Sequence, residues 1–166
     1  MDWPLLVVIV IVILVAATVL KRLSAGTQEA PRYSQRKLFL TPAERSFYGV
    51  LAQAVGTQYR LHTKVRVADV LEPVKGQGRS NWQRAFNRIS SKHFDYVLCN
   101  PDSMRVEMAI ELNDKSHAKD SRKRRDEFLL QACNSAGLKL LSFEAKRAYS
   151  IEELRGSLAV PEDEDV

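Results

Sequence analysis

Cysteine is scarce in this sequence, and its two cysteines lie far apart. Cys99 and Cys133 form no Cys-x-x-Cys pair, which argues against a zinc site and against a disulfide framework. Both lie among apolar residues, so we expect them to be small buried hydrophobic side chains. The rest of the composition is ordinary, with 45% hydrophobic and 27% charged residues, and it excludes collagen-like and broadly disordered chains.

Charged residues are absent between Trp3 and Leu20, a stretch made mostly of valine, isoleucine and leucine. As a helix this stretch would extend roughly 27 Å, close to the hydrocarbon thickness of a bilayer, about 30 Å. A core helix of a soluble domain would keep a polar face, and this stretch has none. We therefore predict a transmembrane anchor over residues 1–23.

The charges that flank this anchor predict its orientation. Asp2 is the only charged residue before it, whereas five basic residues follow it, namely Lys21, Arg22, Arg32, Arg36 and Lys37. Basic flanks stay in the cytoplasm, so we expect a single-pass inner (cytoplasmic) membrane protein with its N-terminus outside and its domain in the cytoplasm. A cleaved signal peptide is the alternative, but the basic segment that should open it is missing.

The remaining chain divides into three parts. Residues 24–40 are polar, contain Pro31 and read as a juxtamembrane linker. Residues 41–158 are long enough for one compact domain with a core that needs no disulfides. The acidic residues 159–166 are expected to form a disordered tail. The formal net charge is +5, and a basic domain suits anionic partners such as nucleic acid or lipid headgroups.

Local patterns in the domain predict the element order α-β-α-β-β-α-β-α. Thr41, Pro42 and Glu44 form a helix start with a capping box. From Tyr59 to Val67 apolar and polar residues alternate, which predicts a strand whose apolar side chains all point to one face. The other face would carry Arg60, His62, Lys64 and Arg66, either as a solvated edge or as a surface for nucleic acid.

Two apolar runs, 94–99 and 106–112, flank the turn Asn100-Pro101-Asp102-Ser103 and predict a hairpin. A turn centred near Ser103 places Asp95 opposite Glu111, with Cβ atoms about 5 Å apart. Two carboxylates so close repel each other unless a positive charge lies between them, and a hard divalent cation meets that need. The alternative is that both carboxylates face solvent on a half-exposed sheet.

Basic residues gather just beyond this hairpin. Lys115 can place an ammonium group near the two carboxylates, and His117 could donate to a phosphate oxygen or transfer a proton. The start of the next helix carries Lys119, Arg122, Lys123, Arg124 and Arg125. Because cations at a helix N-terminus oppose its dipole, this cluster favours phosphate contact; a solvated cationic face is the alternative.

Taken together, these segments resemble a known group of enzymes. The segments are Thr41-Pro42-Ala43-Glu44, Phe94-Asp95-Tyr96, Ile110-Glu111-Leu112, Lys115-Ser116-His117 and Arg124-Arg125-Asp126. The constellation resembles the restriction-endonuclease-like PD-(D/E)xK superfamily. More narrowly, it resembles the bacterial family catalogued as domain of unknown function 2726, which is similar to the very-short-patch-repair endonucleases. The resemblance spans about Leu38 to Leu158.

The resemblance implies an α/β fold, with a restriction-endonuclease-like mixed central sheet flanked by helices, and a phosphodiesterase site that uses Mg²⁺ or Mn²⁺. Asp95 and Glu111 would be the metal-binding acids, Lys115 the catalytic lysine and Glu44 an accessory carboxylate. Asn113 stands where the family pattern usually has aspartate. Its carbonyl oxygen can still bind a metal, but it brings no charge, so metal affinity should be lower.

Two functions follow as expectations. The first is a membrane-anchored, metal-dependent nuclease that acts on DNA in preference to RNA. The second is a catalytically inactive, membrane-anchored module of the same fold that binds nucleic acid or a protein partner. A basic face that meets anionic lipid is a third reading. The sequence indicates no preference for a particular nucleotide sequence and no pathway.

Overall fold

The computed structural model describes residues 3–24, 30–113 and 120–158, without the side chains of residues 22–24 and 120–123. The chain divides into two units, Met1–Lys37 and Leu38–Val166. The first contains helix α1, Trp3–Ser24. Its Trp3–Lys21 segment has a mean hydropathy of 3.0 and no buried residues, so α1 could cross a membrane by length and composition.

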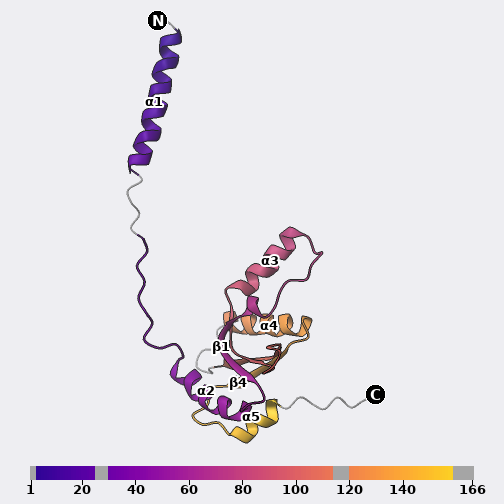
Figure 1. Ribbon diagram of the computed structural model, residues 1–166. Helices are drawn as coiled ribbons and strands as arrows, with labels where there is room; N and C mark the ends of the chain where they lie inside the picture. Colours follow the sequence, from indigo (N-terminus) through magenta and orange to yellow (C-terminus); the bar gives the residue numbers. More distant parts are fainter. Residues whose placement is uncertain (1–2, 25–29, 114–119, 159–166) are drawn as a thin grey trace. The chain divides into compact units, whose positions relative to one another are not determined.

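The second unit is a mixed α/β domain (Figure 1). Its elements follow the predicted order, with one added 3-10 helix. They are α2 (Pro42–Val55), β1 (Arg60–Arg66), η1 (Val67–Asp69), α3 (Arg79–Ser90), β2 (His93–Cys99), β3 (Val106–Asn113), α4 (Asp120–Ser135), β4 (Lys139–Glu144) and α5 (Ile151–Leu158).

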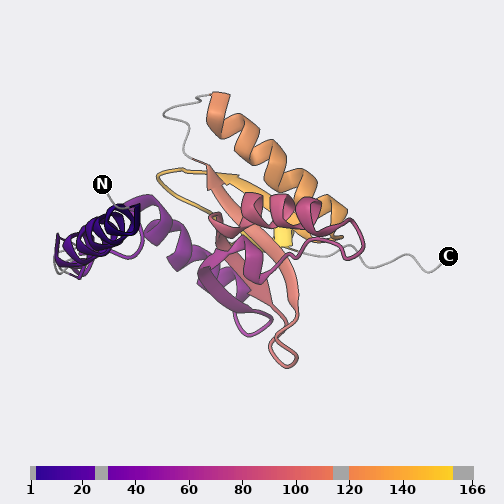
Figure 2. The same ribbon diagram turned by 90° about the horizontal axis from the view of Figure 1, so that it is seen from above.

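The four strands form one sheet in the order β1-β2-β3-β4. β1 and β3 each pair with β2 in antiparallel orientation, and β4 joins β3 in parallel. α2 and α5 lie on one side of this sheet, and α3 and α4 on the other (Figures 1 and 2). The predicted mixed sheet flanked by helices is therefore confirmed.

Each face of the sheet carries its own hydrophobic core. The first core joins α2 and α5 to the sheet and includes Phe47, Leu51, Tyr96 and Leu154. The second joins η1, α3 and α4 to the opposite face and includes Val67 and the predicted buried cysteines Cys99 and Cys133. Burial raises the pKa of the Cys133 thiol to about 11, so this cysteine stays protonated at neutral pH.

The start of α2 is built as predicted. The Thr41 hydroxyl accepts a hydrogen bond from Glu44 N at 3.3 Å, and the Glu44 carboxylate accepts one from Thr41 N at 2.8 Å. Pro42 occupies the first turn, where it costs no backbone hydrogen bond. The reciprocal bonds hold Glu44 in the first turn of α2, where its carboxylate contacts Lys64 of the sheet.

The β1–β2 ribbon reverses its faces at Lys64 and Asp95, which corrects the predicted alternation. Leu61 packs against the first core, whereas Val65 and Val67 belong with the second. The prediction that all apolar side chains of this segment share one face is therefore wrong. The physical reason is the left-handed backbone of Lys64, with φ of 54°, because one such residue breaks the period-of-two pattern.

The first core depends on Phe47, which is fully buried. Its ring lies 5.4, 5.2 and 4.9 Å, centroid to centroid, from Tyr96, Phe143 and Tyr149. We predict that Phe47→Ala lowers the free energy of unfolding by about 3–5 kcal/mol, because it leaves a cavity at this junction.

Urea unfolding followed by circular dichroism measures this change. The neighbouring Tyr48 is 38% exposed, so Tyr48→Ala is the matched control and should change stability by less than about 1 kcal/mol. Equal losses in the two variants would contradict the described packing.

Candidate functional site

Glu111 is the one charged residue buried among those that the structure describes, with 6% of its surface exposed. It lies near the end of β3, and its Oε2 accepts a hydrogen bond from Arg125 of α4 at 3.3 Å. Its Oε1 is buried and has no hydrogen-bond partner among the described residues. Since burying an unsatisfied carboxylate oxygen is costly, this atom indicates a place where a cation or a donor belongs.

Asp95 lies on the neighbouring strand and is held from two sides. Its Oδ1 accepts a hydrogen bond from Lys64 Nζ at 3.0 Å, and its Oδ2 accepts one from the backbone N of Leu112 at 3.0 Å. The second bond ties the carboxylate to β3, one residue beyond Glu111. Asp95 and Glu111 therefore converge on the same short stretch of the β2–β3 pair.

The hairpin register agrees with the prediction. Tyr96 pairs with Ile110, and Val97 with Ala109, as predicted, and the Asp95 carboxylate just beyond these pairs accepts a hydrogen bond from Leu112 N, next to Glu111. The register shifts only next to Cys99, on the turn side of the hairpin. The shift therefore leaves the carboxylate end unaffected.

Lys64 brings a third carboxylate to this place. Its Nζ lies 2.5 Å from Glu44 Oε1 and 3.0 Å from Asp95 Oδ1. Glu44 is fixed further because Tyr96 Oη donates to its backbone oxygen at 2.6 Å. A left-handed backbone costs a residue such as lysine roughly 1–2 kcal/mol, and strain of this kind is concentrated at functional sites.

The electrostatics of the site follow from burial and from these neighbours. Burial first, and the charge of Asp95 second, raise the pKa of Glu111 from 4.5 to about 7. Arg125 and Lys64 oppose that rise. Glu111 therefore lies close enough to Asp95 to feel its charge, and it is only partly ionised near neutral pH.

Glu44 and Lys64 stay charged instead. Burial opposes ionisation of both groups. The hydrogen bonds of Glu44 to Lys64 and to Thr41 N outweigh burial and lower the Glu44 pKa, and the bonds to Glu44 and Asp95 likewise raise the Lys64 pKa. One ammonium group is thus shared between Glu44 and Asp95, whereas Glu111 forms its one ion pair among the described residues with Arg125, at the longer distance of 3.3 Å.

Two carboxylates on adjacent strands can hold a hard cation, provided that other oxygens complete its coordination. Magnesium commonly binds through one or two carboxylates together with water and substrate phosphates. Within residues 3–24, 30–113 and 120–158, no group of three His, Cys, Asp or Glu side chains could hold a metal ion by itself. The buried Glu111 Oε1, together with Asp95, therefore fits a cation that is bound by two carboxylates and completed by other oxygens.

Several predicted site residues are placed elsewhere or fall outside the description. Asn113 lies two residues beyond Glu111 on β3, on the same face by strand alternation. Arg66 pairs with Asp69 at 2.5 Å, while Arg60 and Arg124 are exposed. Lys115, His117 and Lys119, with the side chains of Arg122 and Lys123, lie outside the described residues.

The predicted outward basic face of β1 is wrong for Lys64, which points into the carboxylate cluster. The sequence carried no signal for this, because a lysine in an alternating strand reads as solvent-facing. The contact between Arg125 and Glu111 was also missed, since it depends on how α4 packs against β3. The one sequence signal for this contact was the basic cluster at the start of α4, which follows an acid that lies in an apolar run.

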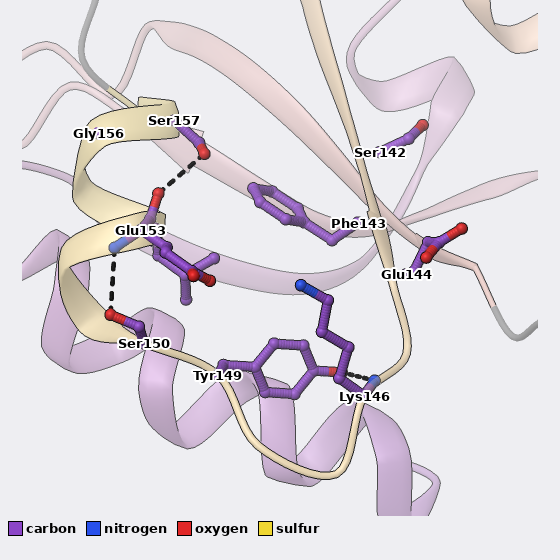
Figure 3. Close-up of a pocket in the computed structure, with 10 residues that line it drawn as sticks. Ser142, Phe143, Glu144, Lys146, Tyr149, Ser150, Glu153, Gly156 and Ser157 are labelled. Atoms are coloured by element: carbon purple, nitrogen blue, oxygen red, sulfur yellow. Dashed lines mark hydrogen bonds between the residues drawn. The ribbon is translucent and has the colours of Figure 1, made fainter.

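A separate pocket is not lined by any residue of this cluster. It has a volume of about 550 Å³ and is formed by the end of β4 and by α5, where Lys146, Tyr149 and Glu153 line it (Figure 3). Lys146 N donates to Tyr149 Oη at 2.8 Å. The carboxylate cluster is the stronger candidate, because among the described residues it holds the buried Glu111 oxygen that lacks a partner.

Comparison with known proteins gives one match. Residues 35–160 match the family described as "Protein of unknown function (DUF2726)". No curated protein matches the chain, and no solved structure does.

The raised pKa of Glu111 predicts a pH-dependent stability. Because the folded state holds this proton more tightly than the unfolded state, the contribution of Glu111 to stability is fully present below pH 4.5. It falls as pH rises to about 7 and is flat above. The contribution lost is about 3 kcal/mol.

Glu111→Gln should remove this loss. Unfolding free energies of the full chain in detergent micelles with chelator, taken for both proteins across this pH range, measure it. The unfolding free energy of the variant, relative to that of the native protein, should increase as pH rises. A difference that stays constant with pH would show that Glu111 has an ordinary pKa.

Proposed function

Because the chain belongs to the DUF2726 family of proteins of unknown function, we propose its function from the chemistry of its own site. The protein is a membrane-anchored, metal-dependent nuclease that hydrolyses phosphodiester bonds of DNA, with RNA as the second substrate. The observation that carries the proposal is the buried Glu111 Oε1, which lacks a hydrogen-bond partner among the described residues and lies within reach of the Asp95 charge. A buried acid in this state favours a bound cation over a purely structural role.

In this proposal Asp95 and Glu111 hold Mg²⁺ or Mn²⁺, and the Asn113 side-chain oxygen is a further ligand. Such an ion supplies charge stabilisation at phosphorus and lowers the pKa of a bound water. The raised pKa of Glu111 gives the site a pH requirement, since the carboxylate must lose its proton before it can bind a cation.

The other charged residues orient the acids and the substrate. Lys64 neutralises Glu44 and fixes the Asp95 carboxylate against β3. Arg125 contacts Glu111 at 3.3 Å with 44% of its side chain exposed, so its guanidinium can also reach a phosphate oxygen. Lys115 and His117 follow β3 in the chain. We assign Lys115 to stabilising the negative charge on the leaving group and His117 to donating a proton to that group.

The fold is compatible with this assignment. A mixed sheet with acids on two adjacent central strands, β2 and β3, and an accessory acid on the preceding helix supports the restriction-endonuclease-like PD-(D/E)xK relationship. The apolar helix α1 would anchor the protein in the membrane. The basic residues that follow α1 favour a domain on the cytoplasmic side, where DNA is available.

One observation favours a second candidate function, an inactive module that binds nucleic acid or a protein partner. Both Asp95 oxygens already accept hydrogen bonds from protein donors, and Asn113 brings no negative charge. A site with so little unneutralised charge could bind phosphates through its cations without binding a metal.

Calorimetry with Mn²⁺ and a plasmid-cleavage assay on the full chain in micelles test the proposal above pH 7. We expect Mn²⁺ to bind and cleavage to require it. Glu111→Gln should weaken Mn²⁺ binding by at least about tenfold and abolish cleavage.

The matched control is Glu107→Gln, on the same strand but paired with Arg105, and it should leave both readouts unchanged. If Mn²⁺ binds equally well to the Glu111→Gln protein, the proposed site is wrong. DNA binding without cleavage or metal binding would instead support the inactive module.

A further inference from the structure

The segment from Pro73 to Phe94 contains no acidic residue. It carries five fixed cations, Lys75, Arg79, Arg84, Arg88 and Lys92. In a chain with 25 basic and 20 acidic residues, such a stretch concentrates positive charge on one element. That element is α3, together with the loop that precedes it. A local field of one sign attracts a polyanion and repels acidic surfaces.

The helix arranges its polar side chains in a way that suits phosphate contact. Arg84 and Arg88 lie one turn apart on α3. Lys92 follows beyond the end of the helix, and both Arg88 and Lys92 lie over the Phe128 ring. The amide side chains of Asn81 and Asn87 are exposed on α3 as well. Arginine commonly contacts phosphates and guanine in DNA complexes, and asparagine can contact phosphates and adenine.

Only part of the apolar side of α3 is buried in the domain. Ile89 is buried in the second core. Trp82 and Phe86 are half-buried and stack on each other, with ring centroids 5.2 Å apart and planes inclined by 8°. Among the described residues, neither core includes this aromatic pair. The apolar side of α3 is therefore buried in a core only at the C-terminal end of the helix.

α3 also borders an open groove. The groove has a volume of about 450 Å³, lies between α3 and α4, and is lined by Ala85, Ile89 and Phe128. Figure 1 shows α3 at the outer end of its side of the domain. The helix lies on the same side of the sheet as Arg125 and Glu111. Burial first, and the charge of Glu111 second, raise the pKa of Cys133 in α4 on that side. α3 leads directly into β2, which carries Asp95.

We propose that α3 is the element that binds the sugar–phosphate backbone of double-stranded DNA, an inference that rests on the proposed nuclease function. Arg79 and Arg84 contact phosphates, and the Trp82–Phe86 pair packs against the sugar edge. An anionic bilayer is the competing polyanion. A membrane-surface helix needs a wide free apolar face, whereas the apolar face of α3 is partly occupied by Ile89 packing. DNA therefore fits better.

Trp82 offers a direct reporter. The chain has two tryptophans, Trp3 and Trp82, so a Trp3→Phe background leaves Trp82 as the only tryptophan. The experiment titrates this protein, in nanodiscs of phosphatidylcholine with chelator present, with a short DNA duplex. We expect Trp82 emission to change as DNA binds.

In the same background, Arg79→Ala with Arg84→Ala should weaken duplex binding by about tenfold or more. It should also flatten the salt dependence by about one unit of log–log slope for each lost contact. The matched control, Arg105→Ala with Arg147→Ala, removes the same charge from other exposed positions and should change the slope much less. Circular dichroism checks that both variants are folded.

Unchanged Trp82 emission during DNA binding, or equal effects of the two double variants, would overturn the assignment of α3. So would a Trp82 response to brominated phosphatidylglycerol vesicles that exceeds the response to DNA, because it would assign α3 to lipid. Since metal is absent throughout, these outcomes are independent of whether Asp95 and Glu111 form a catalytic site.

Discussion

The balance of charge around the buried Glu111 is the constraint on which the rest of the site depends. One of its oxygens contacts Arg125, the other has no partner among the described residues, and Asp95 lies beside it. Lys64 is shared between Asp95 and Glu44, so the ion pairs of the described residues set three acids, Glu44, Asp95 and Glu111, against two bases, Lys64 and Arg125. The domain tolerates this imbalance by leaving Glu111 partly protonated near neutral pH. A bound cation would remove the imbalance altogether.

The unusual backbone of the domain serves the same cluster. The left-handed conformation of Lys64 reverses the faces of the β1–β2 ribbon. At that point of reversal the Lys64 side chain meets Glu44 from α2 and Asp95 from β2. Helices from opposite faces of the sheet thereby contribute to one site, since Glu44 comes from α2 and Arg125 from α4. The strain at Lys64 is thus coupled to the geometry of the acids.

Much of the fold was predictable from local patterns. The capping box at Thr41, the hairpin turn after Cys99 and the apolar periodicity of α4 each depend on neighbours in the chain. The hairpin register also followed, because Asn100 Oδ1 accepts hydrogen bonds from the backbone N of Asp102 and Ser103 and closes the turn where expected. The register therefore also predicted that Asp95 lies close enough to Glu111 for its charge to act on that residue.

The rest depends on contacts between distant segments. Nothing in the alternation from Arg60 to Arg66 marks Lys64 as a residue with positive φ, and so its inward direction was missed. The apolar residues of α3 likewise could not show from sequence alone that Trp82 and Phe86 stack on each other while Ile89 is buried in the second core. Which carboxylate oxygen lacks a partner is decided by the docking of α4, which local sequence does not encode.

A crystal of the protein soaked with Mn²⁺ above pH 7, with anomalous diffraction measured at the manganese edge, tests the central claim most directly. The account predicts an anomalous peak within coordination distance of Glu111 Oε1 and an Asp95 oxygen, about 2.0–2.3 Å. A Glu111 carboxyl that stays protonated, or a Lys64 or Arg125 nitrogen bonded to Oε1 with manganese bound only elsewhere, would contradict it.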